Sequence, residues 1–287
     1  MLYKPKKIDY TSPASAQGGP GVQKQITHYF GSPYIDMTAA TFAGVSAAIG
    51  ASLGDIWWLG GDARANGGNA FMFVKATAGL TLGQLVAASA TTTGTVTVPG
   101  SPATTTAQVT TNINNAATVA VNGDVDNWIW VTATGAALPQ LRRIKGNSSS
   151  ATAYYTVAKT DPLRPNSPTD KDVFDTLATN GDVCAIIRPY NVLVCTATLT
   201  PIGVALGTVT SGNYTIVQVA GLACVTSVGN GNALVVNQPA IPTAGGAIKG
   251  SAAAAANLYT GASCILPQLA SAAASLIIPA YVNFTGQ

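Results

Sequence analysis

The chain carries little charge. Asp, Glu, Lys and Arg make up 9% of its 287 residues, against about 25% in ordinary soluble domains. The net charge of +3 is small and scattered along the chain, so we expect no nucleic-acid-binding surface. A surface rich in Thr, Ser, Asn, Gln and Gly cannot steer charged ligands. It suits repeated close contact between proteins, because few charges then have to be buried without a partner.

Residues that commonly carry chemistry are scarce. The single histidine, His28, has no cysteine or carboxylate cluster near it, so it predicts no metal site. The sequence contains no G-x-S-x-G elbow, no P-loop and no strand-linked G-x-G-x-x-G. We therefore expect no enzyme and no cofactor. A glycosidase-type carboxylate pair stays open, because such pairs form in space and not in sequence. Four acidic residues follow a glycine, as is typical of turns: Asp55, Asp62, Asp124 and Asp182.

Long apolar runs are also missing. No stretch of 18 or more apolar residues occurs, so we expect no membrane-spanning helix and no membrane partner. MLYKPKK is followed by polar residues and prolines, and we expect no signal peptide. The spacing of the four cysteines matches no metal or redox motif, and we interpret them as small buried thiols: Cys184, Cys195, Cys224 and Cys264.

Turn-forming residues are abundant, with 30 glycines and 16 prolines. From Val183 onward, apolar segments recur roughly every ten residues between turn signals. This pattern predicts a mainly β fold of antiparallel sandwich or barrel-like domains with few short helices. Residues 35–287 would form this β-rich part, with 35–160 and 161–287 as one division into two subdomains.

Several individual elements can be predicted. Ile56 to Leu59 and Ala70 to Ala76 read as strands of one hairpin. The segment LRRIKGNSSS, which begins at Leu141, reads as a polar edge strand guarded by its charges. Residues 36–50 read as a short helix with Asp36 as its cap.

The first 34 residues read as an extended arm. Proline, glycine, serine and glutamine dominate them, and such a segment cannot bury enough surface to order itself without a partner. A solvated chain end is the alternative for its three lysines. The residues that we expect to touch a capsid or subunit partner in this arm are Lys4, Lys6, Lys7, Tyr10, Gln23, His28, Tyr29 and Phe30.

Three segments give the chain a family resemblance. They are GDIWWLGGDARANGGNAFMFVKATAGLTLGQLV, DPLRPNSPTDKDVFDTLATNGDVCAIIRPYNVLV and PIGVALGTVTSGNYTIVQVAGLACVTSV, the last with Gly203, Gly212, Tyr214, Gln218 and Gly221. In order and pattern they resemble the decoration (cement) proteins of tailed-bacteriophage heads, over roughly residues 45–287. The closing part, Gly231 to Phe284, looks like the last strands of that family.

The resemblance implies a non-enzymatic protein, made in the host cytoplasm, on the exterior of a phage capsid. Its partners would be the major capsid protein, whose subunit contacts it would stabilise, and itself, as a homotrimer. Two alternatives stay open. One is a fibre or spike protein that binds carbohydrate, with Trp57, Trp58, Trp128 and Trp130 as stacking candidates, although large aromatics on strands more often pack in a core. The other is a further head or tail component such as a tube subunit.

The stretch YTIVQVAGLACVTSV, from Tyr214 to Val228, alternates without one charged residue. In a capsid protein, one face of such a strand can lie in the core and the other against a neighbour. A lone amide among apolar residues needs a hydrogen-bond partner. We therefore predict that the face with Gln218 lies at a subunit contact.

Overall fold

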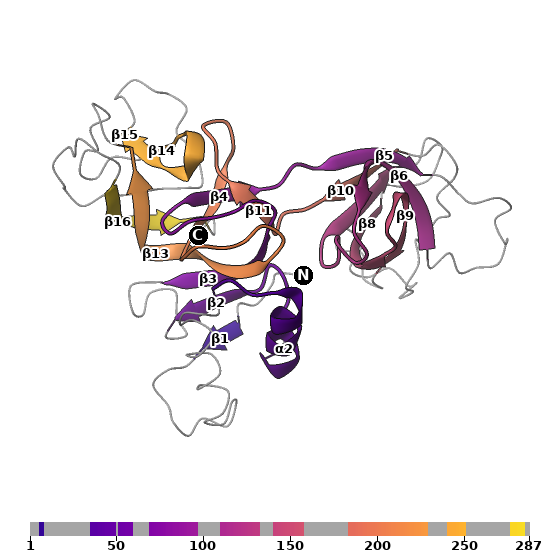
Figure 1. Cartoon of the computed structure of the whole chain (residues 1–287), viewed down its shortest axis with the longest axis horizontal. Coiled ribbons are helices and arrows are strands. Elements are labelled where there is room, and N and C mark those ends of the chain that lie inside the picture. The colour runs from indigo at the N-terminus through magenta and orange to yellow at the C-terminus, as the bar shows by residue number, and fades with distance from the viewer. Residues whose placement is uncertain are drawn as a thin grey trace, which may run out of the picture. The chain divides into compact units, whose positions relative to one another are not determined.

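A computed structural model describes residues 6–8, 35–49, 51–59, 69–96, 110–132, 140–157, 183–228, 240–250 and 276–284. The described chain is mainly β, as predicted, and has one α-helix, α2 (Ala39–Ile49). It divides into two compact units (Figure 1). Residues 90–189 form the inserted unit, and the segments on either side of it, 4–89 and 190–287, together form the second, which we call the main unit.

The main unit is built around a small closed barrel. Its strands are β3 (Ala70–Ala76), β11 (Asn191–Val194), β4 (Leu85–Ala88), β12 (Pro201–Ala205) and β13 (Tyr214–Ser227). Each pairs with the next in that order, and β13 pairs back with β3 to close the ring. Because β3 and β13 come from opposite ends of the chain, neither flanking segment can form this barrel alone.

The inside of this barrel is filled by small and branched apolar side chains. Alternate residues of β3 point inward, and Val217 and Val219 of β13 meet them. This period of two is what a strand imposes on its side chains. The packed residues are Ala70, Met72, Val74, Ala76, Leu80, Val86, Val192, Ala205, Val209, Val217, Val219 and Ala220.

Helix α2 covers part of the outer side of the barrel. Its Phe42 and Val45 pack with Phe73 of β3 and Ile216 of β13. Phe42 also stacks on Tyr214, with ring centroids 4.4 Å apart. Since α2 lies over one side of β13 and the barrel interior lies on the other, the first half of β13 is buried on both sides, which explains the absence of charge there.

The helix boundary was nearly right, but its predicted cap was wrong. Thr38 caps α2, because its Oγ1 accepts a hydrogen bond from the Thr41 N–H at 3.2 Å. Asp36 faces the turn before β13 instead. Its carboxylate accepts hydrogen bonds from the Thr210 N–H, the Thr210 hydroxyl and the Asn213 amide at 3.1, 2.8 and 2.8 Å. Asp36 thus fastens the chain before α2 to the β12–β13 connection.

The second half of β13 leaves the barrel and enters another layer. There it pairs with β16 (Leu276–Asn283) over eight residues and, at Ser227, with β15 (Ile248–Gly250). Strand β14 (Ala240–Pro242) and a 3-10 turn (Ala244–Gly246) flank β15. One side of this layer forms a second core with the outer side of the barrel: Leu85, Ala87, Cys195, Val204, Ala223, Val225, Ala240, Ile248, Ile278, Ala280 and Val282.

Two further strands extend the other side of the main sheet. Strand β2 (Ile56–Leu59) pairs antiparallel with β3, which confirms the predicted hairpin. Strand β1 (Lys6–Ile8) adds to β2 in parallel. Three residues of the predicted arm therefore lie along the chain's own sheet, and the expectation that only a partner would order the arm is wrong for this part.

The inserted unit is a closed six-stranded antiparallel barrel. Its strands are β5 (Thr92–Val96), β6 (Thr110–Val119), β7 (Trp128–Thr132), β8 (Gln140–Asn147), β9 (Ser150–Val157) and β10 (Val183–Ile187). They pair in the cyclic order β10, β5, β6, β9, β8, β7. Strand β8 contains LRRIKGN and pairs on both sides, so the predicted polar edge strand is wrong. Its Arg142 is fully buried.

The predicted division at residue 160 is also wrong. That division assumes that strands adjacent in the sequence pair with each other within one unit. The long-range pairing of β3 with β13 and of β4 with β12 holds the two ends of the chain in one unit. The boundaries therefore lie near residues 89 and 190, where the Ser89 N–H donates to the Asn191 carbonyl at 2.6 Å.

The Asp36 contacts predict a pH dependence. Burial raises the pKa of Asp36, but the hydrogen bonds from Asn213 and Thr210 outweigh it and hold the pKa below its ordinary value of 3.8. A carboxyl group with a lower pKa in the folded state than in the unfolded state stabilises the fold. This contribution is complete at pH values above the unfolded-state pKa, and it is lost as the pH falls through the folded-state pKa. At pH 7, Asp36→Asn should lower the free energy of unfolding by about 1 kcal/mol.

Urea titration at several pH values checks this prediction. The difference between wild type and Asp36→Asn should be full at pH 7 and shrink steadily below pH 3.8. A difference that stays constant from pH 7 to acid would show that the charge of Asp36 contributes nothing.

Candidate interaction surface

Exposed apolar side chains gather on one part of the main unit. Seven large hydrophobic side chains of the described residues are exposed, and five of them lie on or beside β13 and β16 at 43–51% exposure: Leu82, Leu222, Leu276, Ile277 and Tyr281. The other two, Val121 and Val183, belong to the inserted unit. A gathered apolar patch is more informative than scattered exposed residues.

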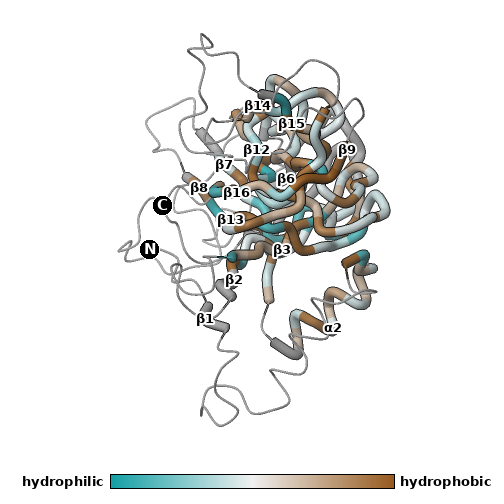
Figure 2. Tube along the Cα trace, turned by 90° about the vertical axis from the view of Figure 1, so that its left-hand side faces the viewer, coloured by the Kyte–Doolittle hydropathy of each residue, from teal (hydrophilic) through white to brown (hydrophobic). Residues whose placement is uncertain are grey.

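The pairing of β13 with β16 places these side chains in one array. Leu222 pairs with Tyr281, Cys224 with Pro279, and Thr226 with Ile277. We call these six residues the β13–β16 face; its two strands lie next to each other in Figure 2. The Thr226 N–H ties the face to the turn at Leu82 by donating to the Gly83 carbonyl at 2.8 Å. Leu276 shares the side of Ile278, so its exposed side chain lies on the opposite side of β16. Neither strand contains a charged residue.

The exposure of this face follows from the alternation of the two strands. Residues Ala223 and Val225 of β13 and Ile278, Ala280 and Val282 of β16 point the other way, into the second core. Their neighbours in sequence must then point outward. The face is thus the outer side of a layer whose inner side is well packed, and its backbone is held in place independently of what touches it.

Gln218 lies elsewhere, and its predicted role is wrong. It is 5% exposed and lies inside the chain. Its amide Nε2 donates to Asn69 Oδ1 and to the carbonyls of Ala220 and Leu222, at 3.1, 3.1 and 3.0 Å. The amide does need partners, as the sequence indicated, but a bulge between Gln218 and Ala220 supplies two of them within the same strand, and Asn69 of the same chain is the third. The exposed face begins four residues further on, at Leu222.

The remaining predicted contact residues lie in the arm. Lys6 and Lys7 belong to β1, where they pair with Trp57 and Trp58 of β2. The structure brings neither of them to Gln218 or to the β13–β16 face through any described contact. The others fall outside the described residues: Lys4, Tyr10, Gln23, His28, Tyr29 and Phe30.

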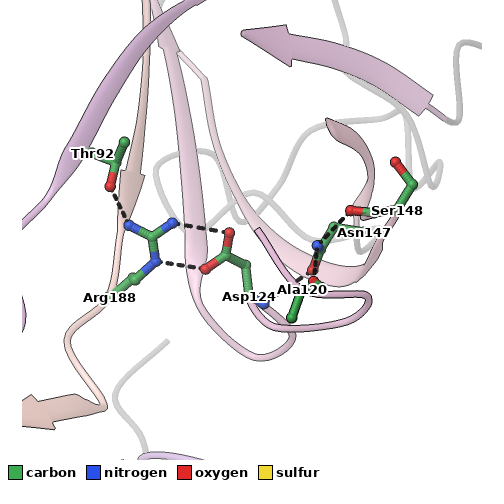
Figure 3. A network of polar contacts seen from close by, with 6 residues as sticks. All are labelled: Thr92, Ala120, Asp124, Asn147, Ser148 and Arg188. Atoms are coloured by element: carbon green, nitrogen blue, oxygen red, sulfur yellow. Dashed lines mark hydrogen bonds and ion pairs between the residues drawn. The ribbon is translucent and has the colours of Figure 1, made fainter. Parts of the chain in front are cut away.

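The inserted unit contains a polar network that the sequence did not reveal (Figure 3). Arg188 Nε and Nη2 donate to the two carboxylate oxygens of Asp124 at 2.5 and 3.0 Å, and Arg188 also binds the Thr92 hydroxyl. The Asp124 N–H donates to Asn147 Oδ1 at 3.0 Å, and the Asn147 amide donates to the Ala120 and Ser148 carbonyls. Asp124 was interpreted only as a turn residue; Arg188, 64 residues away, gave no local signal.

This network has a structural role. Asp124 is 2% exposed, and both of its carboxylate oxygens accept hydrogen bonds from one guanidinium. Such a bidentate pair fixes geometry as well as charge. It joins the loop before β7 to the ends of β5, β8 and β10, and leaves Asp124 poorly placed for acid–base chemistry.

The two tryptophans of β7 lie on the outer side of the inserted barrel. Ile129 between them is fully buried and pairs with Arg142 and Ile186, which are also fully buried. Trp128 and Trp130 therefore point outward and are half-buried, so the expectation that they pack in a core is wrong. The side chains of Trp57 and Trp58 fall outside the described residues.

The described cysteines differ in exposure. Cys184 and Cys195 are buried, which confirms the expectation of small buried thiols for these two, and burial raises their pKa values to about 12 and about 11. Cys224 is exposed in the middle of the β13–β16 face, so the expectation is wrong there. Cys264 falls outside the described residues.

Within the part of the chain that the structure describes, no three His, Cys, Asp or Glu side chains gather as metal ligands would. None of the described helices is long and apolar enough to cross a membrane. Comparisons with protein-family models, curated proteins and solved structures gave no match. The resemblance to decoration proteins therefore stays a prediction.

The structure around the bulge at Gln218 predicts that two glycine substitutions will lower the stability by different amounts. Gly221 and Gly212 have similar positive φ angles, 94° and 89°. A Cβ on Gly221 would lie 2.1 Å from Asn69 Oδ1, whereas a Cβ on Gly212 would meet nothing within 4 Å. Gly212→Ala should cost about 1–2 kcal/mol of stability through backbone strain alone. Gly221→Ala should cost about 4 kcal/mol, because the clash with Asn69 adds to the strain.

Urea unfolding of the two variants measures this difference, and Gly212→Ala is the matched control for backbone strain. Equal losses would show that the contact between Gly221 and Asn69 does not constrain the bulge.

Proposed function

We propose that this chain is a structural virion protein that binds the outer surface of a phage capsid and stabilises contacts between major capsid subunits. The observation that carries the proposal is the β13–β16 face, an exposed, uncharged apolar array on a well-packed layer. A protein whose function is to bind and brace other proteins needs an exposed surface of this kind. The low charge of the whole chain supports the same interpretation.

The arm and the family resemblance supply the further support. Residues 6–8 already add to the edge of the main sheet, so the segment after them starts from a fixed place. An extended segment can cover a large area of a partner, although ordering it costs entropy. The three lysines near the start of the chain add positive charge to a protein that has little of it.

Binding to particles tests the proposal. The purified protein is mixed with capsids that lack it, pelleted with them and imaged by cryo-electron microscopy. We expect density on the outer shell at threefold positions. Density on the tail, or no density on the particle, would overturn the proposal and favour the tail or carbohydrate alternatives.

Deletion of residues 2–30 tests the arm separately. We expect occupancy on the capsid to fall at least tenfold. The free energy of unfolding should change by only about 1 kcal/mol, because a three-residue edge strand contributes little to the fold. Unchanged occupancy would mean that the arm takes no part in attachment. A strand-breaking control, Ile8→Pro in the full-length chain, separates the loss of β1 pairing from the loss of the arm.

Carbohydrate binding is the second candidate, and one observation favours it. Trp128 and Trp130 lie two residues apart on the outer side of β7, where sugar rings can stack on them. Arg143, which pairs with Trp128 across the strands, forms an ion pair with Asp126 at 2.9 Å and adds polar groups beside the rings.

Tryptophan fluorescence tests this candidate. Addition of oligosaccharides from host-surface polysaccharides should shift the emission of the wild type, and Trp130→Ala should lose most of the shift. The absence of any shift across the panel would remove the carbohydrate alternative for this surface.

A further inference from the structure

We propose that the β13–β16 face is an interface between copies of this chain, with the face of one copy packed on the same face of another. The inference names a second copy of this chain as the partner of the surface that carries the proposed function, and in that sense rests on it. Attachment to the capsid would then be made by other surfaces of the pair, the arm among them. It concerns the isolated protein, so it can be tested without any particle.

The free edge of β16 is poorly suited to pairing with a strand of another molecule, so we infer that contact is made through the face. Among the described residues, β16 pairs only with β13. Phe284 donates its N–H to the Val219 carbonyl, and in an antiparallel ladder every second residue repeats this pattern. The backbone groups of residues 277, 279 and 281 therefore point away from β13. Pro279, in the middle of that row, has no N–H to donate, which weakens the edge as a site for strand addition.

The chemistry of the face suits a copy of itself. An isologous contact brings the same surface patch together from both partners, so a charged patch would meet its own charge. The β13–β16 face has no charge to oppose. Its side chains are apolar or weakly polar, and sheet faces of this kind pack on each other in ordinary β-sandwiches.

The size of the face is also adequate. At 48–51% exposure, the three large side chains of the face, Leu222, Ile277 and Tyr281, present roughly 300 Å² of surface. Cys224, Pro279 and Thr226 add to this area, and Leu82 lies beside it. Two such faces together would bury roughly 1,000 Å², the lower bound for a specific interface.

Self-association of the full-length chain, in a Cys264→Ser background, is the first test. Sedimentation velocity should give a mass of twice 28.9 kDa, because an isologous contact joins two copies, and not the homotrimer that the family resemblance implies. Ile277→Lys should weaken association at least tenfold, because it places a charge against a second copy. The matched control is Val121→Lys, which changes an exposed apolar residue of the inserted unit and should leave association unchanged.

Crosslinking through Cys224 locates the interface without changing the face. Cys184 and Cys195 are buried, so a short bismaleimide should join two chains at Cys224 alone. We expect covalent dimers that carry the crosslink between two Cys224 residues. Cys224→Ser should abolish them.

Three results would overturn the inference. The first is a wild type that stays monomeric up to about 0.1 mM. The second is an oligomer that Ile277→Lys leaves intact while the variant folds normally. The third is an oligomer with no Cys224 crosslink. A monomer that still decorates capsids would leave the proposed function standing and assign the face to the capsid. An oligomer that fails to bind particles would support the inference and contradict the proposed function.

Discussion

The main unit depends on the bend in β13. This strand takes part in two cores, since Val217 and Val219 fill the barrel while Ala223 and Val225 fill the layer beside it. A regular strand could not turn from one to the other. The bulge after Gln218 makes the turn, the Gln218 amide binds the carbonyls of Ala220 and Leu222, and Gly221 leaves room for Asn69. Backbone groups that are buried at a bulge need hydrogen-bond partners close by, and here the Gln218 side chain provides most of them.

The exposed face is a result of the same bend. Before it, β13 lies between the barrel interior and α2 and is covered on both sides. After it, only one side is covered, and Leu222 and Cys224 emerge together with Ile277 and Tyr281 of β16. An uncharged sequence is required in the first half because both sides are buried. In the second half nothing within the described chain requires it, whereas the self-contact proposed above would.

Much of the fold could be predicted from the sequence. The mainly β class, the hairpin of β2 and β3 and the approximate range of α2 follow from local pattern and turn residues. The closed barrels could not be predicted, because pairing such as that of Val204 with Gln218 or of Arg142 with Ile129 joins residues without local signal. For the same reason the sequence predicts a subunit contact at Gln218. Its amide needs hydrogen-bond partners, but the carbonyls at the bulge of the same strand provide two of them and Asn69 the third. The charge of Arg142 also leads to a wrong prediction, because it indicates an exposed edge strand whereas the side chain is fully buried.

The insertion of residues 90–189 affects how the main unit can fold. Strands β3 and β4 come before the insertion, and β11, β12 and β13 come after it, so the barrel cannot close until the whole insertion has been made. Closing a loop of about 100 residues costs more entropy than closing a short turn, although this cost grows only slowly with length. If the inserted barrel closes first, it shortens the loop, because its first and last strands, β5 and β10, pair antiparallel with Thr92 opposite Ile186 and bring the two ends of the insertion together. The order of synthesis would then favour the inserted unit as the first to fold, and the face proposed for self-contact would be complete only when β16, the last of the described strands, pairs with β13.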